Sequence, residues 1–251
     1  MKMKKLIASL IALCMLLTLA AASAEGITTI EAGKLIYSTS PDFPPFEFRD
    51  DADNIVGIEP ELIAMIAEKI GLVAEPLPMD FDGALLAARV DQGAKADAVV
   101  SGVTVTEDRK LIYDFTEPYT TITQGIVSKD GAVTEDQLKD KQIGVQSGTT
   151  GQIYAEDDYP NNVTKYETYS LAFQALQNGQ VDCIMVDDAV GNAYIKNIPG
   201  LGIQPTSYEP ENFAFGVSKG NTGLHDAINK VLAELKEDGT VQKLIDTYMV
   251  D

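Results

Sequence analysis

A group of hydroxyl and guanidinium side chains follows a short apolar run in the first half of the sequence. The run Ala98–Val100 is typical of a strand buried on both faces, and Ser101 and Thr104 come directly after it. Arg109 follows in a short helix that Thr106 is expected to cap. Hydroxyls, backbone N–H groups and a guanidinium at the end of a strand suit a carboxylate. Taken alone, the stretch is equally compatible with a strand, a turn and a surface arginine.

Other stretches could complete a binding site around that carboxylate. Gly102 is expected to let a ligand approach the backbone closely. Residues 147–150 (SGTT) open a predicted helix, whose N-terminus also favours an anion. Asp187 ends a second buried strand and offers a carboxylate suited to an ammonium group. With the rings of Phe43 and Phe81, these groups favour a zwitterion with a modest side chain, which is an α-amino acid.

The elements that must position these residues alternate between strands and helices. Strands are expected over 34–39, 72–79, 98–100, 124–128, 142–145, 181–186 and 213–217. Helices are expected over 60–70, 81–92, 134–139, 170–178, 224–236 and 240–248. This order favours parallel α/β sheets. A Gly followed by an apolar run recurs before Ser101 and before Asp187, and this weak internal similarity predicts two similar lobes that bind a ligand at the carboxyl ends of their strands.

The first 24 residues have the features of a secretory signal peptide. Three lysines precede an apolar run over 6–19 that is short for a membrane span, and Ala22-Ser23-Ala24 fits the cleavage rule, so cleavage is expected after Ala24. The bulky Leu13 before Cys14 argues against a lipoprotein signal. Cleavage removes three lysines and no acids, which changes the formal charge from −19 to −22. So acidic a chain disfavours nucleic acid as a partner and favours a soluble monomer.

Soft metal ligands and nucleophile pairs are scarce in the remaining chain. It keeps one cysteine, Cys183, and one histidine, His225, which is expected to be solvated near the start of a surface helix. The polar turn 49–54 partly resembles a calcium loop, but Ile55 and Val56 stand where a further oxygen ligand and a glycine are needed. We therefore expect no metal and no cofactor.

Eight motifs in order resemble the family 3 extracellular solute-binding proteins, the polar amino-acid receptors of ABC importers. The resemblance runs from about residue 34 to residue 248. Its motifs are SPDFPPFEF (40–48), VGIEPEL (56–62), MDFDG (79–83), SGVTVTEDR (101–109), DFTEPY (114–119), GVQSGTTG (144–151), VDCIMVD (181–187) and AELKEDGT (233–240).

This resemblance implies a two-lobed fold of the periplasmic-binding-protein type (type II). Each lobe would be a mostly parallel sheet flanked by helices, and two crossover strands near 120–125 and 213–218 would join the lobes. Lobe 1 would then be discontinuous, over 30–121 plus 218–251, with lobe 2 over 122–217. Closure of the lobes around a free amino acid and delivery to a membrane permease would follow, in the periplasm or outside the cell.

The resemblance also implies roles for individual residues. Arg109, Ser101 and Thr104 would bind the ligand carboxylate, with Thr150 and its neighbour Thr149 contributing from lobe 2. The ligand ammonium would be held by Asp187, although the adjacent Asp188 could compete. The ligand side chain would lie between Phe43 and Phe81, with Ser40 and Phe46 nearby.

Two questions remain open in the sequence. Relatives that bind basic amino acids commonly have an acid three residues before the loop aromatic, where this chain has Ser40, so a neutral polar ligand is favoured and Glu47 and Asp80 are weak substitutes. Phe46 could instead cover the core from its loop.

Exported dehydratases acting on prephenate-like or arogenate-like acids share the fold, but a catalytic histidine is missing from the expected site. A sensor ectodomain would need a following membrane span and is not expected.

Overall fold

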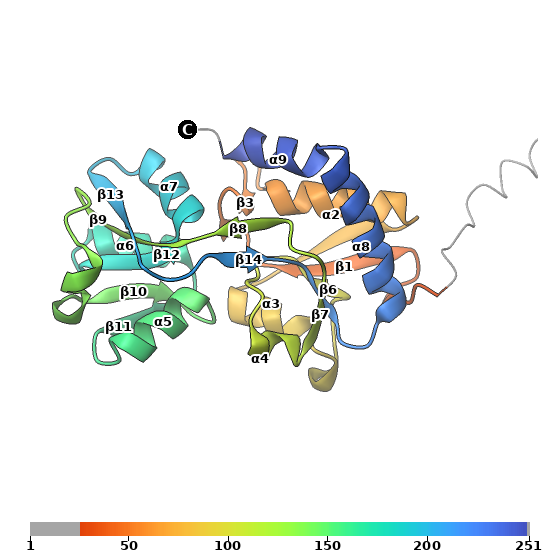
Figure 1. Cartoon of the computed structure of the whole chain (residues 1–251), viewed down its shortest axis with the longest axis horizontal. Coiled ribbons are helices and arrows are strands. Elements are labelled where there is room, and N and C mark those ends of the chain that lie inside the picture. Colours follow the sequence, from red (N-terminus) through yellow and green to blue (C-terminus); the bar gives the residue numbers. More distant parts are fainter. Residues whose placement is uncertain (1–25, 250–251) are drawn as a thin grey trace, which may run out of the picture.

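Residues 26–249 are described by the computed structural model, and they form two α/β lobes side by side along the long axis of the molecule (Figure 1). The expected signal peptide, residues 1–24, lies outside the described residues. Within 26–249, no helix is both long and apolar enough to span a membrane. The two-lobed α/β fold expected from the motifs is confirmed.

The sheet of lobe 1 has five strands, of which β15 runs against the other four. From edge to edge they are β5 (Val73–Pro78), β1 (Lys34–Thr39), β6 (Ala98–Val99), β15 (Gly216–Ser218) and β7 (Tyr113–Phe115). Three helices, α2 (Ile58–Lys69), α8 (Thr222–Glu237) and α9 (Thr240–Tyr248), pack against one another on one side of the lobe (Figure 1). The shorter α3 (Phe81–Ala87), α4 (Glu107–Lys110) and 3₁₀ helix η1 (Val90–Gln92) belong to the other side.

Lobe 2 repeats this arrangement. Its strands are β11 (Val163–Tyr166), β10 (Ile143–Gln146), β12 (Cys183–Asp187), β9 (Gln124–Lys129) and β13 (Leu201–Pro205), and β9 is the reversed one. Its helices are the 3₁₀ helix η2 (Glu135–Asp140), α5 (Thr150–Asp158), α6 (Tyr169–Gln177) and α7 (Asp188–Asn197). The strands β6 and β12, which carry the two similar sequence stretches, occupy the same central place in their sheets. The similarity therefore reflects equivalent strands of two similar lobes.

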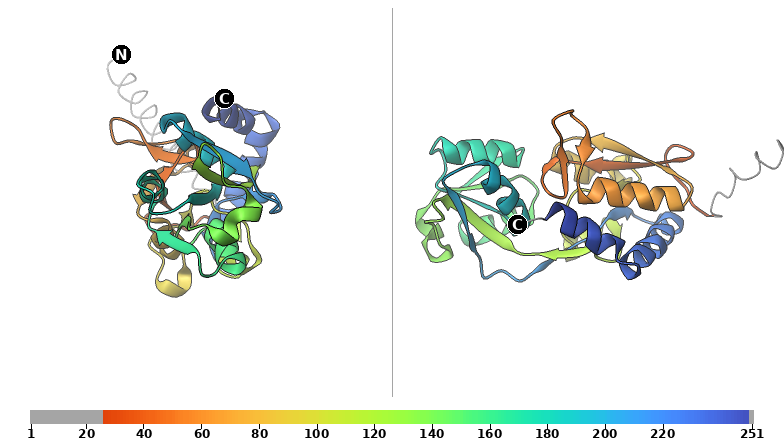
Figure 2. Two further views of the ribbon diagram at one scale, coloured as in Figure 1. Left: turned by 90° about the vertical axis from the view of Figure 1, so that its left-hand side faces the viewer. Right: turned by 90° about the horizontal axis from the view of Figure 1, so that it is seen from above.

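Two extended segments join the lobes. β8 (Thr120–Ile122) and β14 (Glu211–Phe213) pair antiparallel and run side by side between the two bodies (Figures 1 and 2). Each leads into the reversed strand of a sheet, β8 into β9 and β14 into β15. The single strand expected over 213–217 is thus two strands, because the chain leaves the crossover pair before it enters the lobe 1 sheet. The residue bounds of the two lobes stay a prediction.

The other expected elements form with local differences. The helix expected over 81–92 ends as α3 at Ala87, since Arg89 has extended backbone angles (φ −84°, ψ 120°), and resumes as η1. The helix expected over 134–139 is the 3₁₀ helix η2, begun by the predicted capping box of Thr134 and Gln137. A small sheet of β2 (Asp42–Phe43), β3 (Glu47–Arg49) and β4 (Ile55–Val56) carries the Pro-rich loop.

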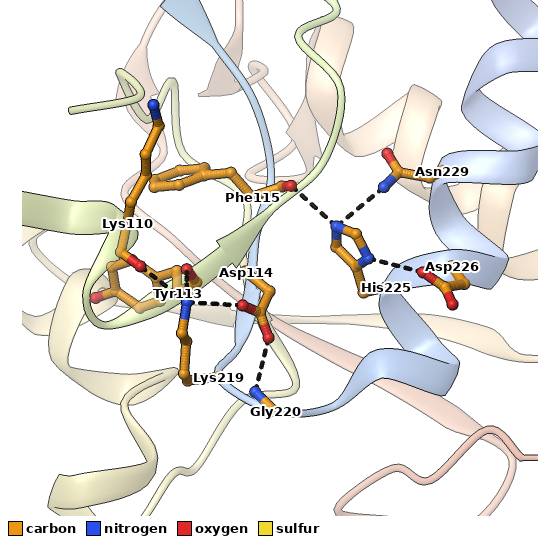
Figure 3. A network of polar contacts seen from close by, with 9 residues as sticks. All are labelled: Lys110, Tyr113, Asp114, Phe115, Lys219, Gly220, His225, Asp226 and Asn229. Carbon is orange, nitrogen blue, oxygen red and sulfur yellow. Dashed lines mark hydrogen bonds and ion pairs between the residues drawn. The ribbon is translucent and has the colours of Figure 1, made fainter. Parts of the chain in front are cut away.

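His225 is less exposed than expected, because it joins the network that fixes the start of α8 to β7 (Figure 3). Its side chain is 24% exposed, and its Nε2 lies 3.0 Å from the backbone oxygen of Phe115. Nearby, Asp114 pairs with Lys219 at 2.8 Å and accepts a hydrogen bond from the backbone N–H of Gly220. The sole histidine thus holds the closing helix of lobe 1 and lies outside the cavity described below.

Candidate functional site

The residues singled out in the sequence meet at a small cavity between the lobes. Its lining includes nine of the ten predicted site residues: Ser40, Phe43, Phe81, Ser101, Thr104 and Arg109 from lobe 1, and Thr149, Thr150 and Asp187 from lobe 2. Glu47, Gly102 and Gln146 complete it. Two aromatic rings and a few converging polar groups make up this lining, which is typical of a small-molecule site.

Arg109 is held in the cavity wall by its short helix and by both lobes. The hydroxyl of Thr106 accepts a hydrogen bond from the backbone N–H of Arg109, as predicted for the cap of α4. The guanidinium is buried and donates to the backbone oxygens of Thr104 and Gly148, each at 2.8 Å. It also lies over the ring of Phe81, 5.7 Å from its centroid. Burial lowers the pKa of Arg109, whereas nearby carboxylates raise it.

Two buried acids, Glu47 and Glu59, accept hydrogen bonds from the turn that follows β6. The Ser101 hydroxyl donates to Oε1 of Glu47 and accepts from the backbone N–H of Ser40, both at 2.9 Å. The backbone N–H of Gly102 donates to Oε2 of Glu59 at 2.9 Å. The expected hydroxyl and backbone donors are therefore partly used within lobe 1. Thr104 instead faces lobe 2, with its Oγ1 3.5 Å from that of Thr150.

Gly102 allows the close approach of an aromatic ring beside the cavity. Its φ is +54°, and a Cβ placed there would lie 2.4 Å from Cε1 of Phe43. That ring is buried and stacks on Phe46 and, from lobe 2, on Tyr169, with centroids 5.7 and 5.8 Å apart. Phe46 lies behind Phe43, outside the cavity lining, and packs edge-on against Phe213. Only the glycine hydrogen leaves room for Phe43 at the cavity.

The lobe 2 wall is the start of helix α5. Thr149 is its cap residue, because the Thr149 hydroxyl accepts from the backbone N–H of Gln152 at 3.1 Å and donates to the backbone oxygen of Gln146 at 2.8 Å. Thr150, the first residue of α5, donates its hydroxyl to Oε2 of Glu211 at 3.1 Å. The first turn of a nine-residue helix therefore faces the cavity, and the helix dipole favours an anion there.

Asp187 and Asp188 point to different places. Asp187 is buried at the cavity, and its Oδ1 accepts from Nε2 of Gln124 at 2.9 Å. Burial, with the nearby charge of Glu211, raises the pKa of Asp187 well above its usual range. Asp188 instead binds the hydroxyl of Thr123 at 2.7 Å, on the segment that follows β8. Of the two acids, only Asp187 is among the lining residues.

Glu47 adds an acid to the cavity wall that the motifs did not assign. It is buried, and burial with the charge of Glu59 raises its pKa well above the usual range. Glu59 is also buried, and it accepts from the hydroxyl of Tyr119 at 2.6 Å. The carboxyl groups of Glu47 and Glu59 also share a hydrogen bond, which requires a proton on one of them. Glu47 therefore places a buried carboxyl group in the cavity wall, where a guest with a hydrogen-bonding group could contact it.

Glu211 and Gln124 are further site residues that spacing alone did not reveal. Glu211 lies on β14, where its carboxylate accepts from Gln124, Thr150 and the hydroxyl of Tyr154 at 2.8, 3.1 and 2.9 Å. Both belong to or adjoin the crossover segments, which carry no motif for a polar site. Three donors satisfy Glu211 within the protein, so it supports the lobe 2 wall. Among residues 26–249, no group of three or more His, Cys, Asp or Glu side chains is arranged to hold a metal ion.

The sequence model of a protein family, the bacterial extracellular solute-binding proteins, family 3, matches residues 35–251 of this chain. The chain belongs to this family. The resemblance drawn from the eight motifs is therefore confirmed, and the two-lobed structure with its cavity between the lobes is the fold of a solute-binding protein.

Curated relatives from several bacteria align over most of their length with this chain. The ABC transporter arginine-binding protein 1 of Escherichia coli is 33% identical over 98% of this chain and 99% of its own. The L-cystine-binding protein TcyJ of the same species is 31% identical over 87% of this chain and 83% of its own. A probable histidine-binding protein of Neisseria gonorrhoeae is 30% identical over 99% of this chain and 96% of its own.

Solved structures show the same architecture. An ancestral arginine-binding protein bound to glutamine superposes with a TM-score of 0.82 and 37% identity, covering 88% of this chain and all of that chain. The same kind of protein bound to arginine gives a TM-score of 0.79 and 38% identity, covering 86% of this chain and 98% of that chain. Related structures thus hold amino acids with either a neutral or a cationic side chain.

Proposed function

We propose that this protein is an extracytoplasmic receptor that binds an L-α-amino acid with a polar side chain between its lobes and delivers it to an ABC importer. The observation that carries this proposal is the placing of Arg109 in lobe 1 and Asp187 in lobe 2 around one small cavity. A buried guanidinium and a buried carboxylate are complementary to the two charges of a zwitterion. Pairing both charges in a desolvated cavity favours the closed arrangement of the lobes.

The ligand carboxylate would bind to Arg109 and to the hydroxyls of Thr104 and Thr150, beside the start of α5. Thr149 would act chiefly by capping that helix and Ser101 by holding Glu47, whereas the Thr150 hydroxyl would exchange its bond to Glu211 for one to the ligand. The ligand ammonium would pair with Asp187.

The ligand side chain would extend between Phe43 and Phe81 toward Glu47. The carboxyl group of Glu47 in the cavity wall favours a side chain that ends in a hydrogen-bond donor. Glu47 and Glu59 lie together in a buried site, where two negative charges are unfavourable, so one of the two carboxyl groups is favoured to hold a proton. A ligand side chain with a neutral hydrogen-bond donor suits this singly charged pair. A cationic side chain would instead require the ionised form of Glu47. The neutral polar amino acids therefore remain our preferred ligands, ahead of the basic ones.

Isothermal titration calorimetry with the full set of L-amino acids tests the ligand class. We expect the tightest binding for a polar side chain that carries an N–H or O–H donor, and weaker binding by at least about tenfold for aliphatic ones, since these offer no hydrogen bond to the buried Glu47 carboxyl group. Mass spectrometry of the ligand recovered after incubation should show it unchanged. Tightest binding of leucine or valine would contradict the assigned role of Glu47, and no binding of any amino acid would contradict the proposal as a whole.

Binding of the ligand is expected to weaken as the pH falls from about 8 to about 5. The pKa of Asp187 is raised well above its usual range in the closed protein, so protons compete with the ligand ammonium for this carboxylate. Below that pKa the affinity should fall by up to about tenfold per pH unit. Calorimetry across this pH range measures the effect. The variant Asp187→Asn should bind weakly with a flatter pH profile, whereas an equally steep profile in the variant would assign the effect to another group.

The same proposal covers location and partners. The family is one of extracellular binding proteins, and we infer export by the N-terminal signal with cleavage after Ala24, into the periplasm or the medium. We further infer that the protein is a monomer, that it docks on a membrane permease, and that it does not transform its ligand. The strongly acidic chain supports the monomer and argues against nucleic acid as a partner.

A further inference from the structure

The loop segment Asp42–Phe43 is where lobe 1 reaches the helices of lobe 2. Oδ2 of Asp42 accepts a hydrogen bond from the backbone N–H of Tyr169 at 2.7 Å. The hydroxyl of Tyr194, on α7, donates to the backbone oxygen of Asp42 at 2.9 Å. The ring of Phe43 stacks on the ring of Tyr169. Two consecutive residues of lobe 1 therefore bind the first residue of α6.

The bond from Tyr169 to Asp42 completes the capping of α6. Within lobe 2, the hydroxyl of Thr168 accepts from the backbone N–H of Leu171 at 3.2 Å and satisfies one N–H group of the first turn. The N–H group of Tyr169 finds its acceptor on the other lobe. A carboxylate at a helix N-terminus is stabilised both by hydrogen bonds and by the helix dipole. Because the two partners belong to different lobes, this stabilisation exists only when the lobes are closed.

Asp42 adjoins the cavity without lining it. Its Oδ1 accepts from the hydroxyl of Ser40 at 2.8 Å and lies 3.5 Å from Nε2 of Gln146. Ser40 and Gln146 both line the cavity, one from each lobe, whereas Asp42 is absent from the lining. The carboxylate is thus positioned to act on lobe closure and not on the ligand itself.

We propose that Asp42 is a closure latch, a lobe 1 carboxylate that caps helix α6 of lobe 2 and thereby sets how readily the lobes close. This inference rests on the proposed function, because it assumes that binding and closure are coupled. The latch raises the population of the closed form by the same factor for every ligand. Apparent affinity is the intrinsic affinity scaled by the fraction of protein that can adopt the binding form. The latch therefore tunes affinity and leaves selectivity unchanged.

Asp42→Ala is expected to raise the Kd about three- to thirtyfold for each amino acid that binds, the range found for removal of a helix cap. The ratio of Kd values between any two ligands should stay within about twofold of wild type. Asp42→Asn keeps an acceptor for the Tyr169 N–H group and should give a smaller increase. Asp51→Ala removes an exposed acid of the same loop region and serves as the matched control, with an expected change below about twofold.

Lobe closure is measured separately by energy transfer between dyes on cysteines introduced at exposed positions, Glu68→Cys in lobe 1 and Lys139→Cys in lobe 2. The native Cys183 is buried and should not react. Asp42→Ala should lower the closed fraction of the ligand-free protein relative to wild type. This readout needs no ligand, so it can succeed or fail independently of the proposed amino-acid function. An unchanged closed fraction, an unchanged Kd, or a Kd change confined to one ligand would each overturn the latch.

Discussion

Arg109→Ala is expected to weaken binding of the amino acid by about thirtyfold to several thousandfold. Truncating one partner of a buried, hydrogen-bonded charge pair costs about 2–5 kcal/mol, much of it because the other charge is left buried and unpaired. The substitution also removes the hydrogen bond from Arg109 in lobe 1 to the backbone oxygen of Gly148 in lobe 2. Calorimetry with the tightest-binding amino acid measures the loss.

One further variant shows whether the geometry or only the charge of Arg109 matters, and a second serves as a control. Arg109→Lys keeps the charge but cannot reach the backbone oxygens of Thr104 and Gly148 with a planar fork, so we expect at least about a tenfold loss. Arg89→Ala is the matched control, because Arg89 pairs with its neighbour Asp91 away from the cavity and its loss should change Kd less than about twofold. Binding by Arg109→Ala within threefold of wild type would show that the carboxylate binds elsewhere.

Asp187→Asn is expected to weaken binding by at least about thirtyfold. The asparagine keeps the size of the side chain and an oxygen for the N–H donor of Gln124, so the change is chiefly the loss of the charge that pairs with the ligand ammonium. Since the raised pKa of Asp187 reflects its burial, the stability of the ligand-free variant should be close to that of wild type or slightly higher. Calorimetry and thermal unfolding measure the two effects.

The neighbouring acid supplies the control for this prediction. Asp188 binds the backbone N–H and hydroxyl of Thr123 and is not among the cavity residues, so Asp188→Asn should change Kd by less than about fivefold. Its effect should also be similar for all ligands, because it acts through the segment that joins the lobes. Equal losses from the two variants would mean that the ammonium is not held by Asp187 alone.

The elements and most of the cavity residues could be predicted because their signals are local. Hydrophobic periodicity and capping residues located most of the strands and helices, including the capped start of α4 at Thr106 and the start of α5 near residues 147–150, but not β7, β11, β13 or α7. Polar residues that follow buried strands, such as Ser101 and Asp187, identified the ends of strands where an α/β fold binds ligands. These are relations between residues a few positions apart, and they are visible in one sequence.

The contacts between distant segments were decided only by the tertiary structure. Asp42 and Tyr169 are 127 positions apart, and nothing in the spacing around either residue indicates that one caps the helix of the other. The same holds for Glu47 behind Ser101 and for Glu211 beside Thr150. The role of Gly102 likewise depends on the ring of Phe43 that packs against it. Local spacing determines which groups a strand or helix presents, whereas the packing of two separately formed lobes determines which of those groups meet.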